Sequence, residues 1–365
     1  MIRRKTDILI IGGGIAGCIA AISLVDEYHV TLIDKLEIPK DRIGESLAPA
    51  AQRILKRLDL CQNLDVEVES KLYRKNLGMQ SYWGSDQVYF VDHMRNPDGM
   101  GLNLDRKEFE IYLRKEAEQR GAYCLWGTRL HKSQYDNSSW KLVAKSSKEE
   151  YEITSDFIID TTGRPSHFTR SLGIDRTSYD KLIACWMSLP NTLENQMSTI
   201  SASENGWWYS AVVPNNKRVI AFQTDSDLTD RSNFKNLESF LHLSEENKEI
   251  QDILNQSSIR DMEFHGVTAA NSTKLDQVAG KQWAALGDAV ISFDPLSSQG
   301  MFNAMACAMQ LRELIRQFGF TEKTSHHYSA QIENIWTHYL GHKDLFYQQE
   351  RRWIGSPFWK RRHKT

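Results

Sequence analysis

The feature of this sequence that most constrains its fold is a glycine-rich turn near its start. Residues 7–11 are a short apolar run that predicts a buried parallel strand, and residues 15–25 predict a helix. Between them lie glycines with the spacing Gly12-x-Gly14-x-x-Gly17. A strand, a glycine turn and a helix in this order are typical of a βαβ unit that binds a dinucleotide.

Each glycine has its own task in such a unit. Gly12 permits the tight turn, Gly14 lets backbone amides approach a pyrophosphate, and Gly17 lets the helix pack closely on the strand. The helix begins at Ile15 and Ala16, where its partial positive charge faces the phosphates. A glycine-rich turn without any ligand is the alternative interpretation.

The residues after the second predicted strand favour the ligand. This strand covers residues 29–33 and ends on Asp34, twenty residues beyond Gly14. An acidic side chain at this place accepts a hydrogen bond from a ribose hydroxyl. We assign the adjacent Lys35 to the same site.

Composition narrows the class of partner. The 365 residues carry a net charge of −2 at pH 7, which argues against general affinity for nucleic acid or an anionic membrane. No apolar run has the length needed to cross a membrane. The five cysteines are scattered without paired spacing, so we expect reduced side chains and neither a disulfide frame nor a metal site. No room remains for a signal peptide before the first strand, so we expect a cytoplasmic protein.

A second polar turn contributes three further candidates. It covers residues 42–49 and precedes a helix predicted over residues 50–58. Arg42 and Ser46 stand where an anion or a polar ring can bind, although Ser46 can equally cap the helix. Glu45 is a candidate to orient a substrate or to transfer a proton, and a surface glutamate is the alternative.

Two later strands each deliver an aspartate and a glycine. Asp160 and Gly163 follow one buried strand, and Gly287 and Asp288 follow another. Ligands of α/β sheets bind at the carboxyl ends of the strands, so we assign Asp160 and Gly163 to the site.

The pattern changes between residues 176 and 274, where β segments predict an antiparallel sheet over a pocket. Four β segments and helices over residues 233–243 and 246–255 are expected there. We predict three parts: a discontinuous cofactor domain (residues 1–80, 101–175 and 275–320), an inserted substrate domain (residues 81–100 and 176–274), and a helical region with a basic, aromatic tail (residues 321–365).

Taken together, the motifs resemble those of the aromatic-hydroxylase-like FAD monooxygenases, which include p-hydroxybenzoate hydroxylase and the tryptophan halogenases. The motifs are Gly12-x-Gly14-x-x-Gly17, Leu104-Asp105-Arg106, Asp160-x-x-Gly163-Arg164 and Gly287-Asp288. The resemblance covers residues 1 to 320. It implies a mixed α/β fold: a Rossmann-like FAD-binding domain, an inserted antiparallel-sheet substrate domain and a helical C-terminus. It also implies FAD, with NAD(P)H or a reduced partner as electron donor.

The resemblance assigns roles residue by residue. It implies that Arg106 reaches the FAD ribose or pyrophosphate, that Asp160 supports FAD and NAD(P)H docking, and that Asp288 binds ribityl or ribose hydroxyls. Pro295 matches a proline beside the isoalloxazine ring. The helix start that matches the flavin N1–C2=O edge consists of Gly300, Met301 and Phe302.

A narrower resemblance points to the substrate. Residues 206–214, Gly-Trp-Trp-Tyr-Ser-Ala-Val-Val-Pro, are similar to the small flavoproteins that accompany lysine ε-oxidase and glycine oxidase. Those flavoproteins are required to make the cysteine tryptophylquinone of their partner. The implied activity is a monooxygenase that uses molecular oxygen, through a flavin C4a-hydroperoxide, to hydroxylate a tryptophan of a precursor oxidase.

The alternatives differ in what the site must contain. A halogenase needs a lysine, for which Lys71 and Lys75 are the candidates, and its Trp-x-Trp signature is matched only imperfectly here. A small-molecule aromatic hydroxylase needs a closed chamber. A reductase or maturation scaffold needs only the flavin. We name Glu45, Pro295 and Trp207 as candidate catalytic residues, with Trp207 and Tyr209 on one face of a strand.

The basic, aromatic tail from residue 351 has two interpretations of its own. It can dock an acidic partner protein, or it can be a solvated segment whose aromatic side chains pack onto the domain.

Overall fold

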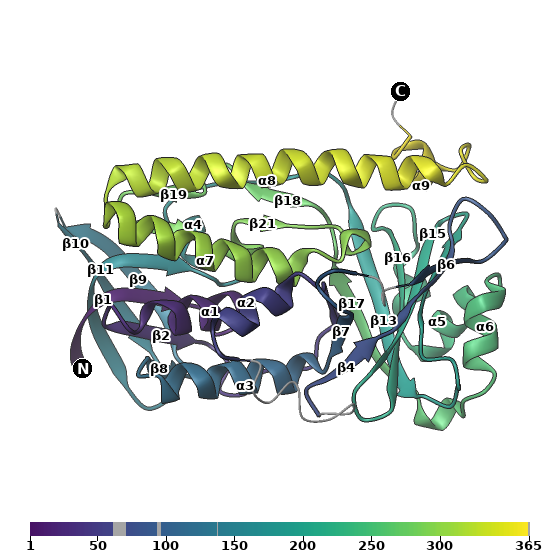
Figure 1. Cartoon of the computed structure of the whole chain (residues 1–365), viewed down its shortest axis with the longest axis horizontal. Helices are drawn as coiled ribbons and strands as arrows, with labels where there is room; N and C mark the ends of the chain where they lie inside the picture. Colours follow the sequence, from purple (N-terminus) through teal and green to yellow (C-terminus); the bar gives the residue numbers. More distant parts are fainter. Residues whose placement is uncertain (61–70, 93–95, 137, 364–365) are drawn as a thin grey trace.

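The computed structural model describes residues 1–60, 71–92, 96–136 and 138–363, so Cys61 and the tail residue Lys364 lie outside the described residues. Two large sheets stand side by side, and the long helix α8 (Glu322–Gln349) runs along both of them (Figure 1). Within the described ranges, none of the helices combines the length and apolar character that a membrane span needs.

The first sheet has eight strands and contains the glycine turn. Strand β1 pairs in parallel with β2 on one side and with β11 on the other, and β11 pairs in parallel with β20. These are the buried parallel strands that the apolar runs predict. The strands are β1 (Ile2–Ile11), β2 (Val30–Asp34), β8 (Tyr123–Trp126), β9 (Arg129–Asp136), β10 (Ser139–Lys145), β11 (Glu150–Asp160), β19 (Ala279–Gly280) and β20 (Trp283–Ala285).

Three helices pack together beside this sheet. Helix α1 (Ile15–Leu24) contacts both α3 (Arg106–Gln119) and α7 (Gly300–Phe318). Nine of the ten residues of α1 are buried, which explains why its sequence is apolar on every side. Helix α3 begins as predicted, because the Asp105 carboxylate accepts a hydrogen bond from the Glu108 amide.

The second sheet has seven strands in the order β17-β13-β16-β15-β14-β5-β6. Helices α5 (Leu237–Ser244) and α6 (Lys248–Leu254) cover one face, through a buried cluster that includes Trp208 and Phe240. The strands are β5 (Gly78–Tyr82), β6 (Tyr89–Asp92), β13 (Leu182–Pro190), β14 (Ser198–Ser203), β15 (Gly206–Val213), β16 (Lys217–Asp225) and β17 (Glu263–Ala269).

The remaining strands form two small sheets, and short helices complete the chain. They are β3 (Ser46–Leu47), β4 (Tyr73–Asn76) and β7 (Gly101–Leu104) in one sheet, β12 (Arg176–Ser178), β18 (Thr273–Leu275) and β21 (Ile291–Ser292) in the other, and helices α2 (Ala51–Arg57), α4 (His167–Ser171) and α9 (Pro357–Lys360).

Three local predictions need correction. Residues 151–154 and 156–159 each predict a separate strand, but β11 runs through Ser155 because β1 pairs with it from Tyr151 to Asp160. The helix expected from residue 233 begins at Leu237, since Asn236 caps it. Ser46 lies in strand β3, and therefore it does not cap helix α2.

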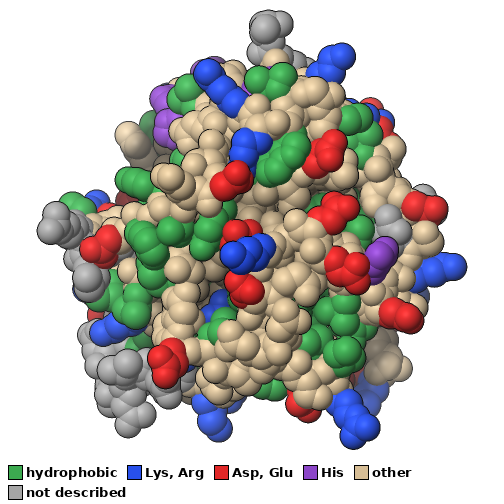
Figure 2. All heavy atoms as spheres, turned by 90° about the vertical axis from the view of Figure 1, so that its right-hand side faces the viewer, with side chains coloured by type: hydrophobic (Ala, Val, Ile, Leu, Met, Phe, Trp, Pro, Cys, Tyr) green, Lys and Arg blue, Asp and Glu red, His purple; other side chains and the backbone are tan. Residues whose placement is uncertain are grey.

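The tail is packed onto the protein. Phe358 and Trp359 are fully buried, and the Arg362 guanidinium forms a buried ion pair with Asp225 at 2.7 Å. This is the second of the two interpretations of the basic, aromatic tail. On the face that Figure 2 shows, acidic and basic side chains are interspersed among hydrophobic ones, in keeping with the small net charge.

Candidate functional site

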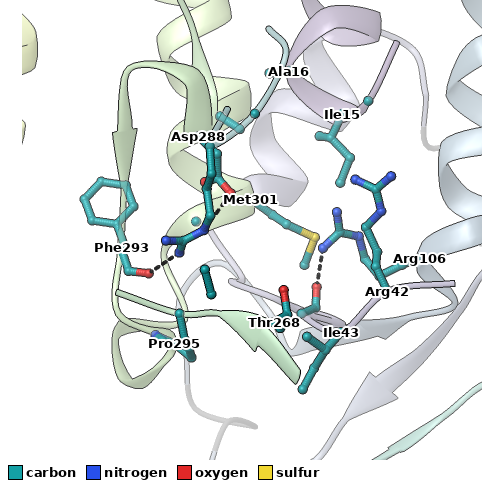
Figure 3. A pocket seen from close by; sticks show the side chains of 18 of the residues that line it. Ile15, Ala16, Arg42, Ile43, Arg106, Thr268, Asp288, Phe293, Pro295 and Met301 are labelled. Atoms are coloured by element: carbon teal, nitrogen blue, oxygen red, sulfur yellow. Dashed lines mark hydrogen bonds and ion pairs between the residues drawn. The ribbon is translucent and has the colours of Figure 1, made fainter. Parts of the chain in front are cut away.

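A cavity of about 1580 Å³ extends from the glycine turn to the seven-stranded sheet. This volume exceeds the roughly 300–1,000 Å³ of pockets for drug-sized ligands, so the cavity has room for a dinucleotide and a second molecule. Figure 3 shows part of the cavity, with Arg42 and Arg106 on one side, Asp288 on the other and the Met301 side chain drawn between them.

The cavity brings together most of the residues that the sequence singles out. Those that line it are Gly12, Gly14, Ile15, Ala16, Asp34, Lys35, Arg42, Glu45, Ser46, Arg106, Gly163, Trp207, Asp288, Pro295, Gly300 and Met301. Four do not line it: Gly17, Asp160, Gly287 and Phe302.

The glycine turn is shaped by two close backbone approaches. Gly12 has a φ of +116°, and an added Cβ would lie 2.3 Å from the Thr161 carbonyl oxygen. A Cβ on Gly17 would lie 1.9 Å from the Gly12 carbonyl oxygen. Gly17 therefore acts through packing. By contrast, a Cβ on Gly14 would meet nothing within 4 Å, because Gly14 faces the open cavity.

Asp34 fixes this turn and has a cationic neighbour that the sequence analysis missed. Its carboxylate accepts hydrogen bonds of 2.6 Å from the amides of Gly13 and Leu36. The Arg114 guanidinium lies 3.4 Å from the same carboxylate and donates to the Gly13 carbonyl oxygen at 3.0 Å. Arg114 also stacks over Trp126. A buried arginine on α3 thus joins the acid to the turn.

A second charged group holds the polar turn of residues 42–49. Arg106 donates to the Gly44 carbonyl oxygen at 2.7 Å and to the buried Glu110 carboxylate at 3.0 Å. The Arg42 guanidinium lies 3.6 Å from that carboxylate. The Nε atom of Arg106 is buried and has no hydrogen-bond partner among the described residues. It therefore retains one donor for a ligand.

Asp160 and Asp288 have different surroundings. Asp160 is fully buried, and its carboxylate accepts hydrogen bonds from the amides of Thr162 and Thr169, both at 2.9 Å, so it fixes the turn after β11. Asp288 lines the cavity with a half-exposed side chain, 3.8 Å from the Arg164 guanidinium.

Two helix N-termini open into the cavity. Neither Gly14, which precedes α1, nor Gln299, which precedes α7, caps its helix through a side chain. The first amides of each helix are thus left for a ligand, and they favour negative charge. An added Cβ on Gly300 meets nothing within 4 Å, so this helix start also faces open space.

The far end of the cavity is aromatic. Trp207 and Tyr209 line it from β15, whereas Trp208 belongs to the cluster under α5 and α6, as the alternation along a strand predicts. On β17, His265 stacks on Trp186 with ring centroids 3.9 Å apart, and burial lowers the pKa of the imidazole.

Glu45 is a buried carboxyl group at this end. Only 3% of the residue is exposed, and burial raises the pKa of the carboxyl above its ordinary value. The Gly44 amide donates to it at 3.0 Å, and Tyr209 and Arg106 also oppose the shift. Glu45 is therefore able to hold a proton at higher pH than a surface glutamate.

Beside the cavity, one hydrogen-bonded chain links three distant segments. The Trp207 indole N–H donates to the Tyr347 hydroxyl at 3.1 Å, and that hydroxyl donates to the Asp294 carboxylate at 2.8 Å. All three residues are 1% exposed. Burial raises the pKa of Asp294. Sequence analysis could have found Asp294 from its position before Pro295, but nothing in the sequence marks Tyr347.

Few lysines line the cavity, and metal-ligating side chains do not cluster among the described residues. The lysines among the described lining residues are Lys35 and Lys132, both on strands or turns of the eight-stranded sheet. Lys71 and Lys75 do not line the cavity. Within the described part of the chain, no cluster of His, Cys, Asp and Glu has the arrangement of a metal site.

Comparison with known proteins identifies the class. A family model described as an FAD binding domain matches residues 5–318, so the chain belongs to this family of FAD-dependent oxidoreductases, within the FAD monooxygenase superfamily. The site fits FAD: two uncapped helix N-termini, the open space at Gly14 and Gly300 and the free Arg106 donor suit an anionic dinucleotide with a polar ring.

Particular relatives narrow this class. LodB of Marinomonas mediterranea, named as an FAD-dependent oxidoreductase, is 27% identical, and the match covers 98% of this chain and 96% of LodB. Several other relatives are named as flavin-dependent halogenases. The solved halogenase CmlS has a TM-score of 0.85 at 24% identity, covering 99% of this chain and 68% of CmlS.

A second solved structure shares the fold. QhpG, described as a peptidyl tryptophan dihydroxylase essential for tryptophylquinone cofactor biogenesis, has a TM-score of 0.79 at 19% identity. The match covers 98% of this chain and 78% of QhpG. These structures confirm the predicted fold class, an FAD-binding α/β domain with an added antiparallel sheet and a helical C-terminus.

Proposed function

We propose that this protein is an FAD-dependent monooxygenase that hydroxylates a tryptophan side chain in a precursor oxidase, during cysteine tryptophylquinone biogenesis. Molecular oxygen is the second substrate, and NAD(P)H or a reduced partner protein is the electron donor. The full-length similarity to LodB and the fold shared with QhpG support this choice among the activities of the family.

The observation that carries the proposal is the aromatic end of the cavity. It combines the walls Trp207, Tyr209 and Trp186 with the buried carboxyl group of Glu45. Planar aromatic walls suit an aromatic ring. Two other lining residues, Tyr89 and Phe346, are 70% and 49% exposed, so the cavity reaches the protein surface, where a side chain of another protein can enter.

In the proposed reaction, the cofactor and the lining residues have different roles. FAD, when bound, supplies the redox chemistry that activates oxygen. The Gly300 helix start stabilises negative charge at the polar ring edge that faces it. Trp207 and Pro295 exclude water and hold the substrate ring in a fixed orientation. Glu45 holds or transfers a proton near the reacting ring.

Halogenation is the second candidate, because several relatives carry that name. A halogenase of this superfamily needs a lysine beside the substrate. The described lining lysines, Lys35 and Lys132, lie with the elements around the glycine turn, which favours hydroxylation.

The test is mass spectrometry of the precursor oxidase produced with and without this flavoprotein. We expect its tryptophan to gain oxygen only with the flavoprotein, and labelled oxygen gas to label the product. Trp208→Phe, which changes the same strand but faces α5, should retain the activity, while Trp207→Ala should lose most of it. Equal oxygenation without the flavoprotein would refute the proposal. A halogen isotope pattern would identify a halogenase, and reduced-donor consumption without product a reductase.

A further inference from the structure

Tyr347 reaches the site from outside the segment that matches the FAD-binding family. It belongs to helix α8, whereas the family match ends at residue 318. The residue is 1% exposed, and its hydroxyl joins Trp207 of β15 to Asp294 of the loop before α7. A single hydroxyl therefore connects the substrate wall, the loop beside Pro295 and the C-terminal helix.

The direction of these hydrogen bonds fixes the orientation of the Trp207 indole. The Trp207 N–H donates to the Tyr347 oxygen, and the tyrosine hydroxyl donates its own proton to Asp294. The indole N–H is thus engaged by a tyrosine that does not line the cavity, and Trp207, which does line it, is only 1% exposed. Asp294 is held in turn, because its carboxylate also accepts a hydrogen bond from the Leu296 amide at 2.9 Å.

The tyrosine ring is itself fixed in place. It lies in edge-to-face contact with Trp83 at 5.8 Å and beside Trp359 at 6.0 Å between ring centroids. The Arg362 guanidinium, paired with Asp225, stands 4.9 Å from the centre of the Tyr347 ring. The hydroxyl consequently has little freedom to move when a ligand enters.

We propose that Tyr347 is a positioning residue of the substrate site: it fixes the Trp207 ring and the Asp294 loop, and thereby sets the shape of the aromatic end of the cavity. The choice of substrate rests on the proposed function, whereas the positioning of Trp207 and Asp294 does not. In this proposal, helix α8 contributes a positioning residue to the substrate site.

The first test needs no substrate. The protein is labelled with 5-fluorotryptophan, and the fluorine resonance of Trp207 is assigned by its absence in Trp207→Phe. Tyr347→Phe keeps the packing of the ring and removes only the hydroxyl. We expect the Trp207 resonance to shift and broaden in Tyr347→Phe. It should stay in place in Tyr328→Phe, which removes an equally buried hydroxyl from the same helix, bonded to the Ala285 carbonyl oxygen at 2.8 Å.

The second test follows hydrogen exchange of residues 294–299 by mass spectrometry in the same variants. Exchange should accelerate in Tyr347→Phe and not in Tyr328→Phe, because only the former releases Asp294. If Tyr347→Phe leaves both the Trp207 resonance and this exchange unchanged, the positioning role is refuted, whether or not the protein hydroxylates tryptophan.

The third test addresses selection of the substrate. In Tyr347→Phe we expect kcat/KM for the precursor protein to fall about three- to tenfold, the size expected when one or two hydrogen bonds are lost. In a Trp207→Phe background the same change should have less effect, because the two residues act as a pair. Equal losses in both backgrounds would show that Tyr347 does not act through Trp207. Absence of product with the unaltered protein would instead refute the proposed function.

Discussion

The two ends of the cavity are built in different ways. The glycine-turn end is formed mostly by backbone within one βαβ unit, where Gly12, Gly17 and Asp34 lie within 23 residues. The aromatic end combines side chains from strands β15 and β17, the loop at Asp294 and helix α8. The comparison teaches that the glycine turn is specified locally, while the aromatic end depends on contacts between distant segments.

The largest expected effect comes from breaking a distant contact at the aromatic end. Arg362→Ala removes the 2.7 Å partner of the buried Asp225 and leaves it only Arg361, at 3.1 Å, so we expect a loss at the low end of about 3–5 kcal/mol in the free energy of unfolding. Denaturant unfolding measures it. Arg361→Ala, whose side chain is 42% exposed, should cost less than about 1 kcal/mol. If both variants lose a similar free energy of unfolding, the buried Arg362–Asp225 pair does not contribute specially to the stability of the packed tail beside the aromatic end.

At the glycine-turn end, two neighbouring glycines should separate folding from binding. Gly17→Ala places a Cβ 1.9 Å from a backbone oxygen, so we expect the FAD-free protein to lose roughly 3 kcal/mol of stability. Gly14→Ala meets open space, so its stability should change by less than about 1 kcal/mol. Its affinity for FAD should fall instead, as measured by fluorescence titration. If Gly14→Ala lost stability and Gly17→Ala lost only affinity for FAD, the roles assigned to the two glycines would be wrong.

The buried Glu45 carboxyl gives a pH-dependent effect. Because burial raises its pKa, the folded state binds the proton more tightly than the unfolded state, whose carboxyl titrates near 4.5. The unaltered protein should therefore lose stability relative to Glu45→Gln as the pH rises above that value, by at most about 1.4 kcal/mol per pH unit. The pKa of Asp294 is also raised, but Asp294 is present in both proteins, so its effect on stability cancels when the two are compared. Parallel stability curves would show that Glu45 does not titrate in this range.

The smallest effect is expected from a residue that the halogenase alternative needs. Lys75 is exposed on β4 and does not line the cavity. Lys75→Ala should leave product formation unchanged and alter the free energy of unfolding by less than about 0.5 kcal/mol. Loss of product in a well-folded Lys75→Ala protein would reopen the halogenase interpretation and extend the functional site beyond the cavity.

The same contrast explains what the sequence could predict. Local rules of spacing and alternation correctly placed the glycine turn, the Asp105 cap and the opposite faces of Trp207 and Trp208. They failed where pairing with a distant segment decides the local structure. Ser46 joins a strand because β7 pairs with it, and Tyr347 reaches the site because the whole of α8 carries it there.

Helix α8 has a mechanical consequence. Its 28 residues span roughly 42 Å, and near its start Ser325 and Tyr328 bond to the eight-stranded sheet. Near its other end, the Phe346 carbonyl oxygen accepts a hydrogen bond from Trp83, which follows β5 of the seven-stranded sheet. A continuous helix attached to both sheets resists hinge bending between them. Helix α8 therefore opposes a movement that would swing one sheet away from the other.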